Sequence, residues 1–348
     1  MKIKFNETLT YDDIQIIPKY SEIKSRDNCI LKTKFTKNFN INIPYVSSPM
    51  DTVTGYDMAV RIMELGGVGC VHRFMSIKEQ SNIIKKLKIK SPRNYPICAS
   101  VGINDNQRID SLIKNGCNII LIDVAHGNTS MVKETIKYIK KNYKNIDIIA
   151  GNIATYEGAK NLCEWGADAL RVGIGNGSLC ETRIRTGIGI PQVTALIDCI
   201  SIAKKYKVPV IADGGIRMIG DVSKALALGS DTVMLGSILS GTKESPGSIE
   251  KMGIWPNEQL FKKYRGSASL ETKKEHNLEE KNVEGNSKII PYKGKIKRLI
   301  DDMNDGIKSA MSYTNSINLK EFKNNSEFIK VTQNGVIEAK PHLLNKNI

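Results

Sequence analysis

A glycine-rich stretch around one cysteine carries the residue types with the clearest potential for chemistry. Residues 173–192 read Gly-Ile-Gly-Asn-Gly-Ser-Leu-Cys-Glu-Thr-Arg-Ile-Arg-Thr-Gly-Ile-Gly-Ile-Pro-Gln. Gly173, Gly175 and Gly177 let the backbone approach a ligand closely, and free N–H or carbonyl groups in such a turn can hold an anion or a cation. Cys180 can act there as a covalent nucleophile, because nearby backbone donors favour its thiolate. The alternative is a glycine-rich turn with an inert thiol.

Turns after two other apolar runs carry groups that suit a phosphate. Their backbone N–H groups and one hydroxyl, together with the Ser178 hydroxyl, can converge on a single anion. The residues of these turns are Gly214, Gly215, Gly236 and Ser237. Either turn alone is equally consistent with a simple tight turn, but the presence of both favours a phosphate site.

Further candidates follow other apolar runs or lie in polar segments. Met50 could cover an aromatic ring through its sulfur, although a turn and helix N-cap at Asp51 or Thr52 explains the same residues. Asp123 ends an apolar run and could accept hydrogen bonds from a ribose, whereas His126 is more typical of a surface residue. Glu284 lies in a charged loop, so it can act as a general acid–base only if that loop closes over a substrate.

Eight short apolar runs alternate with helix-like segments through the first 240 residues. Their length and continuous hydrophobicity are typical of parallel strands buried on both faces. The predicted strands are Ile43–Ser48, Gly67–His72, Pro96–Gly102, Asn118–Asp123, Asp147–Gly151, Ala169–Gly173, Val208–Asp213 and Thr232–Gly236. The predicted helices between them are Met58–Leu65, Lys78–Lys88, Asp105–Asn115, Ser130–Tyr143, Tyr156–Trp165, Gln192–Tyr206 and Gly220–Leu228. An eighth helix is predicted at Ile296–Tyr313.

This alternation predicts an α/β protein with a (β/α)8 TIM barrel, in which residues 1–348 form a single catalytic domain. A doubly wound open sheet is the alternative, but no dinucleotide fingerprint follows the first strand. Residues 174–192 form the expected cysteine loop at the carboxyl end of strand six. The alternation of apolar runs and helix-like segments is absent from about residue 243 to 295. Within this segment, residues 267–294 are expected to form a mobile flap. The tail at residues 328–335 is predicted to form a short strand and a turn.

Composition excludes several classes of protein. The 348 residues contain 51 Lys and Arg against 36 Asp and Glu, a net charge of +15, but the basic residues are scattered without interleaved aromatic residues. Nucleic acid is therefore not expected as the main partner. No apolar run reaches the roughly 18 residues of a membrane span, and the seven cysteines show no disulfide or zinc spacing. A cytoplasmic protein without a membrane partner is expected.

Together, these motifs closely resemble the IMP dehydrogenase and GMP reductase family. The matching segments span nearly the whole chain: Leu9-Thr-Tyr-Asp-Asp13, Ser47-Ser-Pro-Met-Asp-Thr-Val53, Gly173-Ile-Gly-Asn-Gly-Ser-Leu-Cys180, Asp213-Gly-Gly215, Met234-Leu-Gly-Ser237, Tyr264-Arg-Gly266 and Pro291-Tyr-Lys-Gly294. The resemblance implies a TIM barrel that assembles as a homotetramer. Most dehydrogenases of the family carry CBS modules after strand two, but only residues 73–95 separate strands two and three here, so no CBS domain is expected.

The resemblance also implies the chemistry. In both branches a cysteine, here Cys180, attacks carbon 2 of a purine nucleotide. The dehydrogenase oxidises IMP with NAD and hydrolyses the adduct to XMP with an Arg-Tyr pair in the flap, and residues 266–291 contain no Arg-Tyr. The reductase expels ammonia from GMP and accepts a hydride from NADPH, using a threonine and a flap glutamate that match Thr182 and Glu284. GMP reductase is therefore the favoured interpretation. IMP dehydrogenase is the alternative, because Ser47-Ser-Pro-Met50 resembles that branch more closely.

Binding residues are carried over from the family by the same resemblance. The nucleotide is expected at Ser47, Met50, Asn152, Arg171, Ser178, Asp213, Gly214, Gly215, Gly236, Ser237, Gly266, Ser267, Ala268 and Gly285. NADPH, or NAD in the alternative, is expected at Ser25, Arg26, Asp123, Ala125, Ile174 and Gly175. A potassium ion is expected on the backbone carbonyls of Gly175, Gly177 and Cys180.

Overall fold

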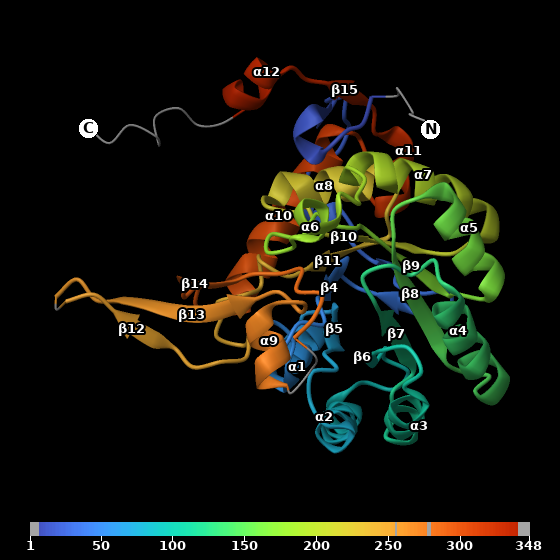
Figure 1. Ribbon diagram of the computed structural model, residues 1–348. Helices are drawn as coiled ribbons and strands as arrows, with labels where there is room; N and C mark the ends of the chain where they lie inside the picture. The colour runs from blue at the N-terminus through green and yellow to red at the C-terminus, as the bar shows by residue number, and fades with distance from the viewer. Residues whose placement is uncertain (1–6, 255, 277–279, 340–348) are drawn as a thin grey trace.

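A computed structural model describes residues 7–254, 256–276 and 280–339 of the chain. The described residues form a barrel of strands ringed by helices, with a sheet that projects from one side (Figure 1). Residues 277–279 of the expected flap lie outside the described residues. So do residues 1–6 and 340–348 of the expected single domain.

In the described chain, eight parallel strands close into a barrel, which confirms the predicted (β/α)8 fold. The order around the barrel is β10-β11-β4-β5-β6-β7-β8-β9. The strands are β4 (Tyr45–Ser47), β5 (Val68–Val71), β6 (Cys98–Val101), β7 (Ile119–Asp123), β8 (Asp147–Ile153), β9 (Ala169–Val172), β10 (Val210–Asp213) and β11 (Thr232–Leu235). Each predicted strand coincides with one of them to within a few residues, because buried parallel strands leave an apolar run in the sequence.

The helices that cover the barrel also follow the predicted alternation. They are α1 (Tyr56–Glu64), α2 (Ile77–Lys90), α3 (Asn106–Lys114), α4 (Ser130–Asn142), α5 (Tyr156–Trp165), α7 (Gln192–Tyr206), α8 (Ile219–Leu228) and α10 (Ile296–Tyr313). Helix α1 begins after Gly55, so Asp51 and Thr52 are not its N-cap. Helix α2 alone connects β5 to β6, where the family can carry a CBS insert.

Alternation along the strands determines which side chains reach the mouth of the barrel. Val46, Ile211 and Met234 belong to a cluster of buried apolar side chains that fills the barrel interior. Since side chains alternate with a period of two, Ser48 follows Val46 toward the mouth and Asp213 follows Ile211. The carboxyl ends of the strands therefore present polar groups above an apolar core.

The chain before β4 and the tail pack against the barrel helices. β1 (Ile14–Ile16) pairs antiparallel with β15 (Phe328–Lys330), which agrees with the strand predicted in the tail. The prediction of a turn after it is wrong, because α12 (Gln333–Glu338) begins there with Thr332 as its cap. The remaining short elements are η1 (Tyr11–Asp13), η2 (Arg26–Asn28), β2 (Thr33–Lys34), β3 (Asn40–Ile41), α6 (Thr182–Thr186) and α11 (Leu319–Asn325).

The segment without a regular sequence pattern forms an antiparallel sheet, here called the flap sheet. It consists of β12 (Glu250–Met252), β13 (Gln259–Arg265) and β14 (Ser287–Pro291). Helix α9 (Leu270–Glu275) lies between β13 and β14 in the chain. Figure 1 shows the sheet projecting away from the barrel. One reason it stays attached is Lys262, a fully buried lysine whose ammonium donates to the carbonyls of Thr242, at 3.1 Å, and Ser245. Burial lowers the pKa of Lys262.

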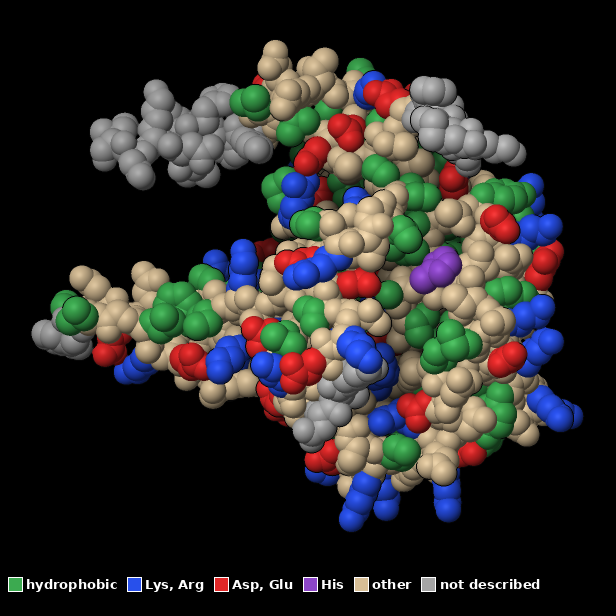
Figure 2. Space-filling view, in the orientation of Figure 1, with side chains coloured by type: hydrophobic (Ala, Val, Ile, Leu, Met, Phe, Trp, Pro, Cys, Tyr) green, Lys and Arg blue, Asp and Glu red, His purple; other side chains and the backbone are tan. Residues whose placement is uncertain are grey.

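The surface shows no single basic stripe on the face seen in Figure 2. Lysine and arginine side chains are spread over its edges and alternate with acidic ones. The expectation that the net charge of +15 does not mark a nucleic-acid site stays a prediction. Within the described residues, no helix is both long and apolar enough to cross a membrane.

Candidate active site

A cavity of about 450 Å³ opens at the carboxyl ends of the barrel strands and is covered on one side by the flap. Most of the residues predicted from the sequence line it together. These are Met50, Asp123, Ala125, Asn152, Arg171, Ile174, Gly175, Gly177, Ser178, Cys180, Thr182, Asp213, Gly214, Gly215, Gly236, Ser237, Gly266, Ser267, Ala268, Glu284 and Gly285. The structure thus brings segments separated by more than 200 residues to one cavity.

Cys180, Thr182 and Glu284 form a hydrogen-bonded chain in this cavity. The Thr182 hydroxyl donates to Glu284 Oε2 at 2.6 Å, and Cys180 Sγ lies 3.2 Å from Thr182 Oγ1. Because the single hydroxyl proton of Thr182 points to Glu284, the threonine oxygen is left to accept the proton of the Cys180 thiol. The arrangement can therefore move a proton from the sulfur toward the carboxylate.

Backbone contacts hold Glu284 beside the cysteine loop. The amide of Glu181 donates to the carbonyl of Glu284 at 2.8 Å, and the amide of Asn286 donates to the carbonyl of Leu179 at 3.0 Å. The amide of Glu284 in turn donates to the carbonyl of Ala268 at 3.1 Å. Glu284 and Asn286 are therefore hydrogen-bonded to the segment that carries Cys180.

Cys180 differs from the other cysteines in its exposure. Cys180 is half-buried in the cavity, whereas the remaining six cysteines are buried. Burial raises the pKa of Cys117 to about 12 and that of Cys163 to about 11, which keeps these thiols protonated and unreactive. Cys180 is therefore the cysteine best placed to act as a nucleophile.

Arg171 joins two carboxylates at the mouth of the barrel. It follows Ala169 in the inward phase of β9, and its guanidinium lies 2.5 Å from Asp123 Oδ1 and 2.8 Å from Asp213 Oδ2. Burial alone would lower the pKa of Arg171, but Asp213 and Asp123 raise it above its usual value. Asn152 adds a hydrogen bond of 2.8 Å to Asp213 Oδ2. The network fixes both carboxylates beside the cavity.

Asn176 ties the cysteine loop to the barrel. Its side-chain amide donates to Gln192 Oε1 at 2.5 Å and to the carbonyl of Asp213 at 3.1 Å. The backbone carbonyl of Asn176 accepts a hydrogen bond from the Gly215 N–H at 2.9 Å, so this N–H is already used in holding the loop. The loop is thus connected both to the end of β10 and to the start of α7.

Gly173 is the first residue after β9, where the cysteine loop begins, and the structure has no room for a side chain at this position. Its φ is 146°, and an added Cβ would lie 1.9 Å from the carbonyl oxygen of Asp213. We expect Gly173→Ala to lower the free energy of unfolding by at least about 2 kcal/mol, from backbone strain and the clash. Denaturant unfolding measures this loss.

Gly187→Ala is the matched control for that substitution. Gly187 lies in the same loop with φ 72°, but an added Cβ there meets no described atom within 4 Å. It should cost only about 1 kcal/mol, the penalty of a left-handed backbone. Equal losses in the two variants would show that the contact with Asp213 is not the cause.

Three predicted site residues do not line the cavity. Ser47 is fully buried on the outward phase of β4, where its hydroxyl accepts from Thr54, and Ser48 lines the cavity instead. Ser25 precedes η2 and Arg26 begins it, and the Arg26 guanidinium contacts the Tyr313 hydroxyl of α10. Within a single chain, the structure therefore gives no support for a cofactor contact at Ser25 or Arg26.

Other lining residues were not predicted from the sequence. They are Ser48, Arg73, Phe74, Val124, Asn176, Leu179, Ile216, Met234, Leu235, Ile238, Tyr264 and Lys273. Tyr264, which lies 3.1 Å from the Ser178 hydroxyl, belongs to a quoted motif and could have been found from it. Arg73 lies two residues after the end of strand β5, beyond His72. A basic residue at the carboxyl end of a predicted strand could have indicated a site residue.

The expected cation site consists only of backbone carbonyls. Carbonyl oxygens are suitable ligands for potassium, and Gly175 has a left-handed backbone that changes the direction of the loop. The Gly177 carbonyl accepts the Cys180 amide at 3.1 Å and keeps its second lone pair. The donor set fits an alkali cation. No group of three or more His, Cys, Asp or Glu side chains suited to a metal occurs in the part of the chain that the structure describes.

Comparison with known proteins agrees with this geometry. Residues 8–342 match the IMP dehydrogenase / GMP reductase domain. The chain belongs to the IMP dehydrogenase / GMP reductase family. It is 37% identical to an inosine-5'-monophosphate dehydrogenase of Cryptosporidium parvum over 96% of this chain and 94% of the relative. The enzyme of the same name from Borreliella burgdorferi is 36% identical over 97% of both chains, and that from Nitrosopumilus maritimus 31% over 98% and 99%.

Membership in the IMP dehydrogenase / GMP reductase family makes the chain an oxidoreductase of purine nucleotides that uses a nicotinamide cofactor. The relatives named above are all dehydrogenases, so these comparisons give more support to IMP dehydrogenase than to GMP reductase.

Proposed function

We propose that the chain is a GMP reductase, which converts GMP to IMP and ammonia with a reduced nicotinamide cofactor, NADPH. The observation that supports this most directly is the chain of contacts from Cys180 Sγ through Thr182 Oγ1 to Glu284 Oε2, at 3.2 and 2.6 Å. It gives one nucleophile and one proton carrier in the same cavity, which is what the displacement of an amine requires.

The steps follow from the direction of these hydrogen bonds. The thiol proton of Cys180 passes through Thr182 to Glu284, and the thiolate forms a bond to carbon 2 of the purine. Glu284 then returns the proton to the 2-amino group, the bond between carbon 2 and nitrogen breaks, and ammonia leaves. When bound, the reduced nicotinamide supplies the hydride that carbon 2 needs for the carbon–sulfur bond to break and release IMP. Cleavage of the carbon–sulfur bond leaves Cys180 as a thiolate, which takes up one proton from solvent, so one hydride and one proton are consumed for each ammonia released.

The flap lacks the groups expected for hydrolysis. The resemblance assigns water activation in the dehydrogenases to an Arg-Tyr pair, and residues 266–291 contain none. Arg265 is the only arginine in residues 250–294, and its guanidinium contacts Asp51 and Glu275 instead of lining the cavity. A reaction that needs no activated water therefore fits this flap better than hydrolysis.

Oxidation of IMP with NAD is the second candidate, and the names of the relatives favour it. In that reaction Cys180 adds to IMP, a hydride leaves carbon 2, and water releases XMP. Thr182 and Glu284 would then have to activate the water themselves. Both branches share the barrel and the cysteine loop, so identity over the whole chain reflects the shared scaffold more than the flap.

We propose that the nucleotide and the cofactor occupy different parts of the cavity. We assign the phosphate of the nucleotide to Ser178 and to the turns after β10 and β11, and its base to Met50 and residues 266–268. Asp123, Ala125 and Ile174 line the same cavity and are proposed to hold the cofactor. A potassium ion on the loop carbonyls and a homotetramer are part of the same proposal.

A paired spectrophotometric assay tests the direction of the reaction. The purified protein is given GMP with NADPH in one cuvette and IMP with NAD in another, with a potassium salt in both, and the absorbance of the reduced cofactor is followed. We expect the absorbance to fall with GMP and NADPH and to stay constant with IMP and NAD. A rise in the second mixture with no change in the first would assign the dehydrogenase reaction instead.

A further inference from the structure

A buried carboxylate outside the cavity holds the base of the flap. Asp51 lies in the turn after β4, and its Oδ2 accepts from Arg265 Nε at 2.9 Å and Nη2 at 2.5 Å, while His276 Nε2 lies at 3.1 Å. The side chain of Asp51 is 4% exposed and that of Arg265 13%. Two hydrogen bonds from one guanidinium to a single carboxylate oxygen, shielded from water in this way, fix the position of the guanidinium far better than a surface pair would.

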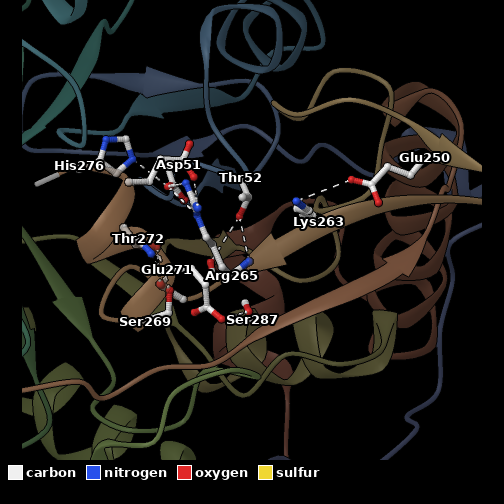
Figure 3. Close-up of polar contacts among 12 residues, drawn as sticks. Asp51, Thr52, Glu250, Lys263, Arg265, Ser269, Glu271, Thr272, His276 and Ser287 are labelled. Atoms are coloured by element: carbon white, nitrogen blue, oxygen red, sulfur yellow. Dashed lines mark hydrogen bonds and ion pairs between the residues drawn. The ribbon is translucent and has the colours of Figure 1, made fainter. Parts of the chain in front are cut away.

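The residue next to Asp51 holds the backbone of the same arginine. The amide of Arg265 donates to Thr52 Oγ1 at 3.2 Å. Figure 3 shows Asp51 and Thr52 on one side of Arg265, with His276 approaching Asp51 from the end of α9. Both the side chain and the backbone of Arg265 are thus fixed by one turn of the barrel.

The turn that follows Arg265 is hydrogen-bonded to the segment that carries Glu284. Residues 266–268 come directly after Arg265, and the carbonyl of Ala268 accepts the amide of Glu284 at 3.1 Å. The amide of Gly266 donates to the carbonyl of Asn286 at 2.9 Å, on the other side of Glu284. The flap segment that carries Glu284 is therefore bonded at both sides to the turn that begins at Arg265.

We propose that Asp51 is a positioning residue for the reaction: through Arg265 it holds Glu284 at hydrogen-bonding distance from Thr182. Asp51 and Arg265 do not line the cavity, so neither contacts the nucleotide or the cofactor in this arrangement. The inference rests on the catalytic role proposed for Glu284, and it holds for either direction of the reaction. Displacing a catalytic group by about 1 Å can cost on the order of 10²-fold in rate.

The test is a double-mutant cycle between Asp51→Asn and Glu284→Gln. Asp51→Asn keeps the shape of the side chain but removes the charge that orients Arg265. We expect kcat to fall by about 10–10²-fold with the KM for the nucleotide nearly unchanged. In the Glu284→Gln background the same substitution should cause no further fall in kcat, because the effects of substitutions that act through one group are not additive. Asp51→Glu, which keeps the charge, should recover part of the rate.

Glu275→Gln is the matched control, because it removes the other carboxylate partner of Arg265. The Glu275 side chain is 63% exposed, so its loss should leave kcat unchanged. If Asp51→Asn does not fold, as judged by circular dichroism, Arg265→Lys replaces it in the cycle, since lysine lacks the planar guanidinium that places two donors on Asp51 Oδ2.

The outcomes separate this inference from the proposed function. An unchanged kcat in a folded Asp51→Asn enzyme, or equal losses in both backgrounds, would overturn the positioning role while leaving the proposed chemistry intact. A Glu284→Gln enzyme with full activity would instead show that the proposed chemistry itself is wrong.

Discussion

Replacing Cys180 with alanine abolishes turnover while the protein still binds its nucleotide. Cys180 is the half-buried thiol of the cavity, and its sulfur is the atom that forms the bond to carbon 2 in either direction of the reaction. Without it, no adduct forms, and we expect kcat to fall by at least about 10⁴-fold, the scale seen when a covalent enzyme loses its nucleophile. The absorbance of the reduced cofactor measures turnover, and titration calorimetry with GMP measures binding.

Cys163→Ala is the matched control for the loss of a thiol. Cys163 is buried on α5, away from the cavity, and its raised pKa of about 11 keeps it protonated. This variant should retain the wild-type kcat and lose only a little stability. A Cys180→Ala enzyme with measurable turnover, under conditions in which Cys163→Ala behaves like wild type, would rule out the covalent role.

Replacing Glu284 with glutamine is the second large effect. The amide oxygen of glutamine can still accept the hydrogen bond from Thr182, so the geometry is kept, but the amide cannot take up the proton. We expect kcat to fall by about 10²–10⁴-fold, the usual contribution of a general acid–base, with little change in the KM for GMP. Steady-state kinetics with GMP and NADPH measure both constants.

Glu280→Gln provides a matched change of charge in the same flap. The Glu280 carboxylate lies 4.0 Å from Lys274 and both side chains are more than half exposed, so its contribution to stability is small. It should leave kcat unchanged. Equal effects of the two substitutions would indicate that the charge of the flap matters, and not a proton carried by Glu284.

The barrel could be predicted from the sequence because its strands are buried on both faces. Continuous apolar runs such as the one at Ile119–Asp123 mark each strand. The helices between them show the helical spacing of apolar residues. The flap sheet could not be predicted in this way. β14 exposes most of its residues and β13 buries only Lys262 and Tyr264, so neither strand shows an apolar alternation. Lys262 at the centre of β13 has the sequence character of a surface residue although it is fully buried.

The candidate site was only partly accessible from the sequence. Cys180 and Thr182 are neighbours in the chain, but Glu284 reaches them from 102 residues away, and only the resemblance to a family linked these segments. The contact between Asp51 and Arg265 spans 214 residues and leaves no local pattern. By contrast, the choice of Ser48 over Ser47 follows from the alternation of side chains along β4.

The most direct test of the central claim is the intact mass of the protein after incubation with GMP alone, followed by a denaturing quench. If Cys180 displaces the amine before any hydride is transferred, the protein gains the mass of GMP less that of ammonia. One ammonia is then released per site, and Cys180→Ala shows neither change. The claim would be contradicted if GMP left the mass unchanged while IMP with NAD produced an adduct on Cys180.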